Sequence, residues 1–150
     1  MADIREQADE LCRSWRELMT MYEECAKAVG LSYSGLNVLS IIYANDQSCT
    51  QKMIAEETLY PKQTVNAIIR GFWKDGLIRQ TEVSTDRRNK TIHLTKAGKA
   101  FADKVVPQIM RAETKALEKL AAKQRQDFIQ GSRQYLQRFR ECLSEHFDIK

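Results

Sequence analysis

The chain is 150 residues long, 43% hydrophobic and 29% charged, with a formal net charge of +4. A chain of this length and composition can bury a core and is most simply one folded unit. No run approaches the roughly 18 apolar residues of a membrane span. The N-terminal segment MADIREQADE has no apolar core, so we expect neither a membrane helix nor a secretory leader, and we expect a cytosolic protein.

Charge is distributed unevenly along the chain. Residues 1–30 carry four Lys and Arg against seven Asp and Glu, whereas residues 50–100 carry ten against five and residues 101–150 carry ten against seven. A positive segment suits a nucleic-acid binder whose affinity comes largely from phosphate contacts. A solvated surface can have the same excess, so the distribution is only supporting evidence.

The N-terminal segment has the spacing of an amphipathic helix. Apolar residues recur at alternating steps of four and three from Ile4 to Val29, and Gly30 follows as a stop. Ser32 can cap a second helix, which carries Leu36 among its apolar residues and ends near Asn45-Asp46.

Residues 50–95 have the order of a DNA-reading module. A short helix is predicted at Thr50–Glu57, a second from Pro61 to a stop at Gly76, and a hairpin after it. The hairpin comprises a strand at Leu77–Val83, a basic tip at Ser84–Lys90 and a returning strand at Thr91–Leu94. This is a winged helix-turn-helix, which puts one helix in the major groove and the hairpin on the backbone or in the minor groove.

The second helix of this module has two contrasting faces. One is an apolar stripe made by Val65, Ile68, Ile69 and Phe72. The other carries side chains that reach bases and phosphates, because amides pair with adenine and Arg with guanine. These are Lys62, Gln63, Asn66, Ala67, Arg70 and Lys74. Any exposed helix face is polar, so the prediction depends on the elements on either side.

The hairpin tip concentrates cations. Arg87, Arg88 and Lys90 would repel one another unless they meet an anion, and Asp86 can hold one arginine by a charge-assisted bond. The alternative is an ordinary solvated turn with a surface ion pair of little energetic value.

The C-terminal part is predicted to be helical. Thr95 can cap a long helix from Lys96 to about Leu120, kinked by Pro107, and a last helix runs roughly from Gln124 to His146. The apolar faces at both ends of the chain exceed what the module can cover, so we expect them to pack on each other and on a second copy. The fold class is therefore mainly α with a small β-hairpin wing. Residues 1–30 and 96–150 are assigned to dimerisation and 31–95 to DNA binding.

These residues resemble the MarR family of bacterial transcriptional regulators along essentially the whole chain. The similar segments are TQKMIAEET, PKQTV, WKDGLI, the wing signature at Asp86–Arg88, and the L-T-x-x-G motif of Leu94, Thr95 and Gly98. The resemblance implies an obligate homodimer that binds a palindromic operator. It also implies repression of a nearby gene, with release by a small, often aromatic or phenolic, ligand.

The resemblance also implies roles for individual residues. Arg88 is the wing arginine with Asp86 as its support, and the groove contacts are Gln63, Thr64, Asn66 and Arg70. Pro61 stands where the family usually has Ser, so Tyr60 becomes the candidate for a hydroxyl–phosphate contact. Candidates to line a ligand pocket are Trp15, Met19, Tyr22, Tyr33 and Tyr43, all of which could equally be core.

The four cysteines, Cys12, Cys25, Cys49 and Cys142, form no CxxC pair and have no His at ligand spacing, so no zinc or other cofactor site is predicted. They are interpreted as free thiols at apolar positions. Some relatives sense peroxides through an N-terminal cysteine, and a redox switch at Cys12 is an alternative to a thiol packed in the dimer interface.

Two other classes of function are less consistent with the sequence. The only histidines are His93 and His146, and nothing places a nucleophile or an orienting carboxylate beside either, so an enzyme is not predicted. A winged helix used for protein contacts would need an apolar or acidic recognition face, whereas this one is basic and rich in amides.

Overall fold

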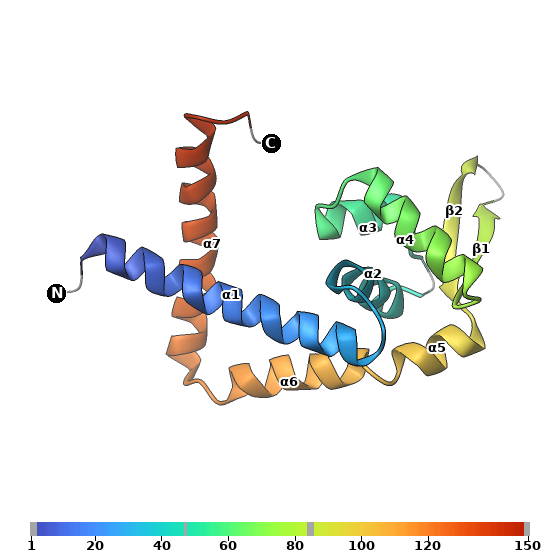
Figure 1. The fold of residues 1–150 in the computed structure, drawn as a ribbon, viewed down its shortest axis with the longest axis horizontal. Coiled ribbons are helices and arrows are strands. Elements are labelled where there is room, and N and C mark those ends of the chain that lie inside the picture. Colours follow the sequence, from blue (N-terminus) through green and yellow to red (C-terminus); the bar gives the residue numbers. More distant parts are fainter. Residues whose placement is uncertain (1–2, 47, 84–85, 149–150) are drawn as a thin grey trace. The chain divides into compact units, whose positions relative to one another are not determined.

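The computed structural model describes residues 3–46, 48–83 and 86–148, without the side chains of residues 83 and 86–89. The fold is mainly helical with one antiparallel hairpin (Figure 1), as the sequence predicted. In chain order the elements are α1 (Ile4–Ala28), α2 (Tyr33–Ala44), α3 (Gln51–Thr58), α4 (Lys62–Lys74), β1 (Ile78–Val83), β2 (Asp86–Leu94), α5 (Lys96–Ala102), α6 (Val106–Glu118) and α7 (Ala122–Ser144). Two compact units comprise residues 1–108 and 109–150.

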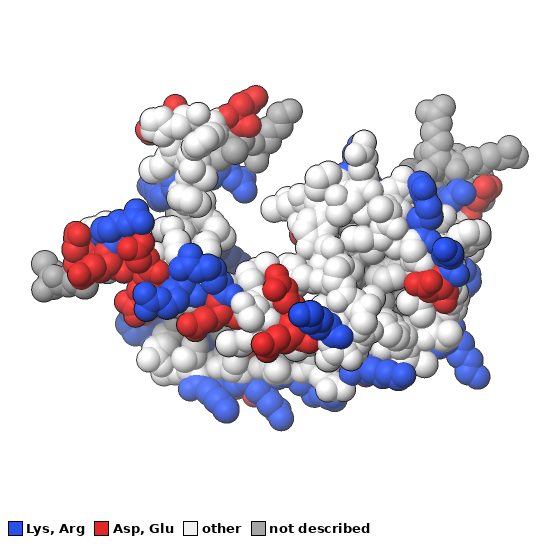
Figure 2. Space-filling view, viewed as in Figure 1, with Lys and Arg blue, Asp and Glu red and all other residues white. Residues whose placement is uncertain are grey.

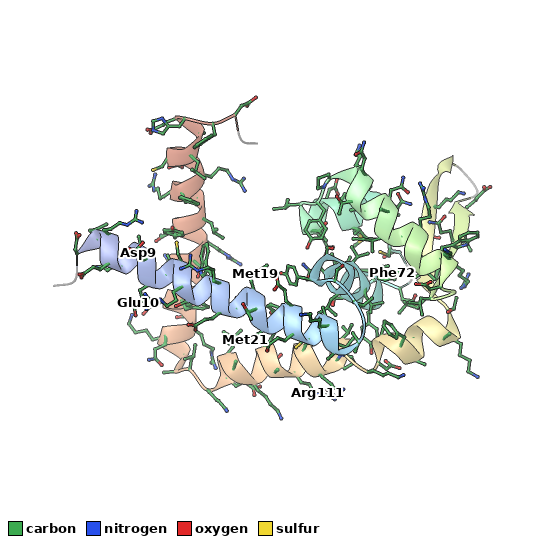
Figure 3. All side chains as sticks on the ribbon, viewed as in Figure 1. Asp9, Glu10, Met19, Met21, Phe72 and Arg111 are labelled. Carbon is green, nitrogen blue, oxygen red and sulfur yellow. The ribbon has the colours of Figure 1, made fainter. Side chains whose placement is uncertain are left out.

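Helix α2 is the centre of the first unit. It contacts α1, α3, α4, α5 and β2, and Leu36, Val38, Leu39 and Ile42 are buried along it. A helix that is apolar on several sides is expected in a core. The other elements bury their apolar faces in the same core, with Ile54 from α3, Val65, Ile69 and Phe72 (Figure 3) from α4, and Ile78 and Ile92 from the hairpin.

The hairpin is held at its base by the segment that follows α2. The strands pair from Ile78 opposite Leu94, with an irregularity after Glu82. The backbone amide of Ile92 donates to the Cys49 carbonyl at 2.8 Å, and that of Leu94 donates to the Asp46 carboxylate at 2.7 Å. The predicted tip was too long, because the backbone of residues 86–90 already belongs to β2.

Thr95 and Gly98 join the hairpin to α5. The Thr95 hydroxyl accepts from the Gly98 amide at 2.9 Å and donates to the Gly76 carbonyl at 2.7 Å. The Thr95 amide donates to the Leu77 carbonyl at 3.0 Å. A Cβ atom on Gly98 would fall on that same carbonyl oxygen, so α5 can approach the chain at Leu77 only with glycine there.

The prediction of one kinked helix from Lys96 to about Leu120 is wrong. Helix α5 ends at Ala102 and α6 begins at Val106, with a turn between them. Pro107 is the second residue of α6, where no partner exists for the amide that proline lacks, so it marks the start of a helix instead of a kink within one.

Large apolar side chains are exposed on α1 and α7. On α1, Leu18 and Met21 (Figure 3) are 50% and 58% exposed, and on α7, Phe128 and Leu136 are 60% and 52% exposed. No residue within α7, all of which is described, is buried. None of the described helices is by itself long and apolar enough to cross a membrane; only α1 and α2, bent by 79° at their junction, meet the length and composition criteria as a pair.

The four cysteines are free thiols in different surroundings. Cys12 and Cys142 are exposed, Cys25 is half-buried and Cys49 is buried. Burial raises the pKa of the Cys49 thiol to about 11, and the carboxylates of Glu57 and Asp46 add to the shift. The sequence prediction of a thiol at an apolar position therefore holds for Cys49.

Cys49 should accordingly resist alkylation in the folded protein. The thiolate is the reactive form, and raising the pKa from the reference 9.0 to about 11 lowers its population about 100-fold near neutral pH. Mass-spectrometric mapping of iodoacetamide labelling should show Cys49 reacting about 100-fold faster in denaturant than in buffer. Equal rates under the two conditions would contradict this burial.

Candidate nucleic-acid interface

Helix α4 separates its apolar and polar side chains by face. Val65, Ile69 and Phe72 are buried, and Ile68 is half-buried, which confirms the predicted stripe. The opposite side is exposed over the whole helix and carries Lys62, Gln63, Asn66, Ala67, Arg70 and Lys74, while Thr64 is half-buried. Their contacts with DNA stay a prediction.

Three cations on this face form no ion pair with another described residue. Among the described residues, the ion pairs involve other side chains, and Lys62, Arg70 and Lys74 take part in none of them. In the view of Figure 2, acidic and basic side chains are mixed along α1, and Lys and Arg side chains with acidic neighbours lie over the part formed by α4 and the hairpin. An exposed face of unpaired cations raises the local concentration of an anionic partner.

The turn before α4 presents a fixed hydroxyl. The Asn37 side-chain amide donates to the Tyr60 hydroxyl oxygen at 2.8 Å, which leaves the hydroxyl hydrogen able to bond a phosphate oxygen. Leu59, just before it, has φ of 59° and is 79% exposed. Tyr60 lies just before the first turn of α4, and its contact with a phosphate stays a prediction.

A small notch lies between α4, the start of α3 and β1. It has a volume of about 150 Å³ and is lined by Gln51, Asn66, Ile69, Arg70, Trp73 and Gln80. Sequence reasoning assigned no role to Gln51, Trp73 or Gln80. Trp73 follows the buried Ile69 by one helical turn, so periodicity places it at the edge of the stripe, yet it is 63% exposed.

The wing is described only in part. Lys90 is exposed and lies opposite Glu82 in the hairpin register. The side chains of Asp86, Arg87 and Arg88 lie outside the described residues, so their roles stay predictions from the sequence. Arg79 on β1 is a further exposed cation that the sequence analysis did not name.

The five candidates for a ligand pocket do not converge on one cavity among the described residues. Trp15 and Met19 line a shallow hollow on α1, together with Cys12. Tyr33 lines a second hollow, beside α1, and its ring centroid is 5.9 Å from that of Tyr22. Tyr43 lines neither hollow.

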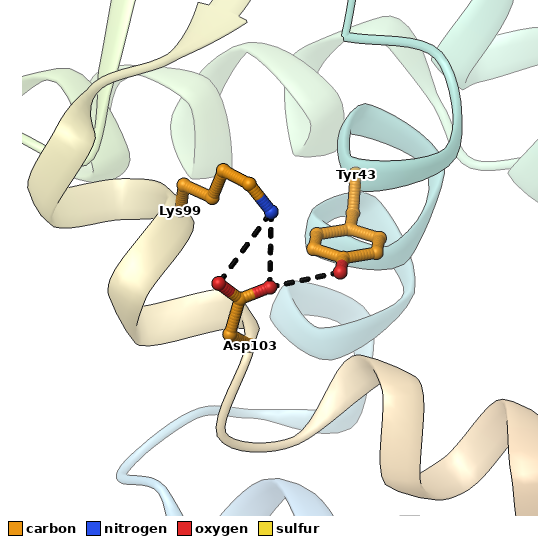
Figure 4. Close-up of polar contacts among 3 residues, drawn as sticks. All are labelled: Tyr43, Lys99 and Asp103. Atoms are coloured by element: carbon orange, nitrogen blue, oxygen red, sulfur yellow. Dashed lines mark hydrogen bonds and ion pairs between the residues drawn. The ribbon is translucent and has the colours of Figure 1, made fainter.

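Tyr43 instead fastens α2 to α5 (Figure 4). Its hydroxyl donates to the Asp103 carboxylate at 2.8 Å, and Lys99 donates to the same carboxylate at 3.1 Å. The bond from Tyr43, followed by the bond from Lys99, lowers the pKa of Asp103, and the bond to Asp103 raises the pKa of Lys99. Lys99 and Asp103 are exposed, so the contact fixes orientation more than it adds stability.

The described residues hold no group of three or more His, Cys, Asp and Glu placed to bind a metal ion. His93 has a structural environment: its Nδ1 lies 2.7 Å from the Asp46 carbonyl, and its Nε2 lies 3.0 Å and 3.1 Å from the Thr91 and Thr81 hydroxyls. It helps to anchor the hairpin base.

The sequence is similar to that of known transcriptional regulators. Residues 29–89 match the model of the MarR family. The chain is 29% identical over 86 residues to the HTH-type transcriptional regulator SarZ of Staphylococcus epidermidis, an alignment covering 57% of each protein. It therefore spans little more than half the length of the curated relatives it matches.

Solved structures share the fold. A MarR family regulator from Neisseria meningitidis is similar with a TM-score of 0.75 and 26% identity, over 94% of this chain and 99% of that one. The structure of Streptococcus pneumoniae FabT in complex with DNA is similar with a TM-score of 0.73 and 16% identity, over 93% and 99% of the two chains.

Proposed function

We propose that the chain is a MarR family member, since residues 29–89 match the family model, and that it is a transcriptional regulator that binds double-stranded DNA. The observation that carries the proposal is the exposed face of α4, where cations and amides stand without ion pairs among the described residues. Amide and guanidinium groups on a helix of this motif are suited to base edges and phosphates. The site of action is then the cytoplasm, where bacterial DNA lies.

The working form is a homodimer on a palindromic operator. The apolar side chains exposed on α1 and on α7, including Leu18, Met21, Phe128 and Leu136, support this assignment, since large exposed apolar side chains on a helix face mark an interaction site. Two copies related by a two-fold axis present two α4 helices to two half-sites. In this proposal residues 1–30 and 96–150 dimerise and residues 31–95 bind DNA.

The regulator acts as a repressor that a small aromatic ligand releases. Two shallow hollows support this proposal. Tyr33 lines one of them, with its ring centroid 5.9 Å from that of Tyr22, and Trp15 and Met19 line the other. Aromatic side chains around a concavity are typical of sites for small apolar molecules.

The first experiment is a gel-shift titration with the promoter of the protein's own gene and a scrambled duplex. Asn66→Ala should relax preference at one base pair of each half-site by about 1–3 kcal/mol and leave scrambled-duplex binding nearly intact. Arg88→Ala should weaken both duplexes by about 1–3 kcal/mol, because a wing cation acts through phosphates or a groove with a degenerate code.

Thermal unfolding of both variants is the control, and both should melt close to the unmutated protein because neither change touches the buried stripe. Equal weakening of both duplexes by Asn66→Ala, together with altered base preference in Arg88→Ala, would invert the two roles. Failure of the unmutated protein to shift any duplex at low salt would favour a winged helix that contacts proteins.

A further inference from the structure

We propose that the notch between α4 and the hairpin binds one backbone phosphate of the DNA, on the strand segment that separates the major groove from the neighbouring minor groove. The notch is the hollow lined by Gln51, Asn66, Ile69, Arg70, Trp73 and Gln80. This inference rests on the proposed function and adds a site within its surface that neither the sequence analysis nor the comparisons assign.

The position of the notch follows from how a winged helix meets a duplex. Helix α4 enters the major groove while the hairpin lies beside it on the adjacent minor groove or its edge. A single sugar–phosphate backbone divides two adjacent grooves, so it must pass between α4 and the hairpin. The notch is lined from both elements, because Arg70 and Trp73 come from α4 and Gln80 comes from β1.

The lining matches a phosphodiester in charge and hydrogen bonding. Arg70 supplies an exposed guanidinium, Gln51 and Gln80 supply side-chain amide donors, and the lining contains no carboxylate. Phosphate oxygens are acceptors only, and groups of these kinds make most backbone contacts in protein–DNA complexes. A volume of about 150 Å³ admits one phosphate with part of its sugar and leaves no space for a base pair.

Trp73 gives the notch a feature that a surface of cations alone would lack. Its side chain is 63% exposed on a face where the neighbouring apolar residues Ile69 and Phe72 are buried. The indole N–H is a donor for a phosphate oxygen, and the flat ring can lie against deoxyribose. Arg70, which the sequence analysis assigned to guanine, therefore becomes a backbone contact, and Asn66 keeps the role of base reader.

The test replaces single phosphates of the duplex by neutral methylphosphonates, one position at a time, and measures affinity. For the unmutated protein, one position in each half-site at the groove boundary should lower affinity about tenfold. Arg70→Gln should lower the affinity for the natural duplex about tenfold. A methylphosphonate at the sensitive position should then lower the affinity of this variant little further. Trp73→Phe, which keeps an aromatic ring and removes the indole N–H, should reproduce part of this insensitivity.

Lys74→Gln is the matched control, because it removes one exposed cation from α4 outside the notch. It should weaken binding to every duplex and keep full sensitivity to the methylphosphonate. Gln80→Ala is a second test variant, which changes a residue of β1 and leaves the charge unchanged. Like Arg70→Gln, it should be insensitive to the methylphosphonate at the groove boundary. Arg70 and Trp73 are exposed, so circular dichroism melts of these variants should match the unmutated protein.

Two results would overturn the inference while leaving DNA binding intact. One is that Arg70→Gln and Lys74→Gln respond identically at every methylphosphonate position. The other is that Arg70→Gln alters base preference and leaves phosphate sensitivity unchanged, which would restore Arg70 as a base contact. Absence of binding to every duplex at low salt would instead overturn the proposed function and the inference with it.

Discussion

Raising the salt concentration from about 50 to about 200 mM should weaken duplex binding by about four orders of magnitude. The cations expected on the DNA side are Lys62, Arg70, Lys74, Arg87, Arg88 and Lys90. If about four per protomer meet phosphates, a dimer displaces counterions from roughly eight, and the slope of log affinity against log salt is about −7. Fluorescence anisotropy with a labelled duplex measures this slope directly.

A pair of variants separates the contribution of cations that contact phosphates from general electrostatic attraction. Lys74→Gln should make the slope shallower by about 2 for a dimer, because each protomer loses one phosphate contact. Lys115→Gln removes an equally exposed cation from α6 and should leave the slope unchanged. A slope shallower than about −3 for the unmutated protein would show that the α4 face and the wing are not the DNA surface.

Gly98→Ala should destabilise the fold by about 3 kcal/mol, the upper end of the usual range for overpacking. The added methyl group would occupy the position of the Leu77 carbonyl oxygen, which is backbone and cannot rotate away. Relief requires moving α5 away from Leu77, which also breaks the bonds of Thr95 to the Gly76 and Leu77 carbonyls. Urea unfolding followed by circular dichroism measures the loss.

Gly71→Ala is the matched control for this change. Gly71 lies inside α4, and a Cβ atom there meets nothing within 4 Å. Alanine is favoured over glycine within a helix, so this variant should gain about 0.5–1 kcal/mol. A Gly98→Ala protein as stable as the Gly71→Ala protein would show that α5 does not pack as closely as the structure describes.

The parts of the fold that depend on local chemistry could be predicted from the sequence. Ser32 and Thr95 were predicted as N-caps, and each side chain accepts the expected backbone hydrogen bond, from Gly35 at 3.0 Å and Gly98 at 2.9 Å. The apolar period placed α1 and the buried side of α4 correctly. Both signals come from residues a few positions apart, and no tertiary information is needed to interpret them.

The parts that depend on distant packing could not be predicted. The turn between α5 and α6 carries the same apolar spacing as a continuous helix, so the sequence alone predicts a kink at Pro107 instead of a break. Trp73 has the helical phase of a buried residue and is exposed because nothing covers it in the described chain. The partner of the Tyr43 hydroxyl, Asp103, lies sixty positions later in the chain, so local spacing does not indicate the bond between them.

The joint between the hairpin and α5, formed by Thr95 and Gly98 against the main chain of Gly76 and Leu77, also affects how the sequence of such a protein can diverge. Its partners on the other side are the main-chain carbonyls of Gly76 and Leu77, which every residue type supplies. Mutations that change the side chains on the exposed surface of α4 or along the hairpin therefore leave this joint unaltered. Under the proposed function, substitutions on these surfaces can change the preferred operator one at a time, while the hydrogen bonds that connect the hairpin to α5 are kept.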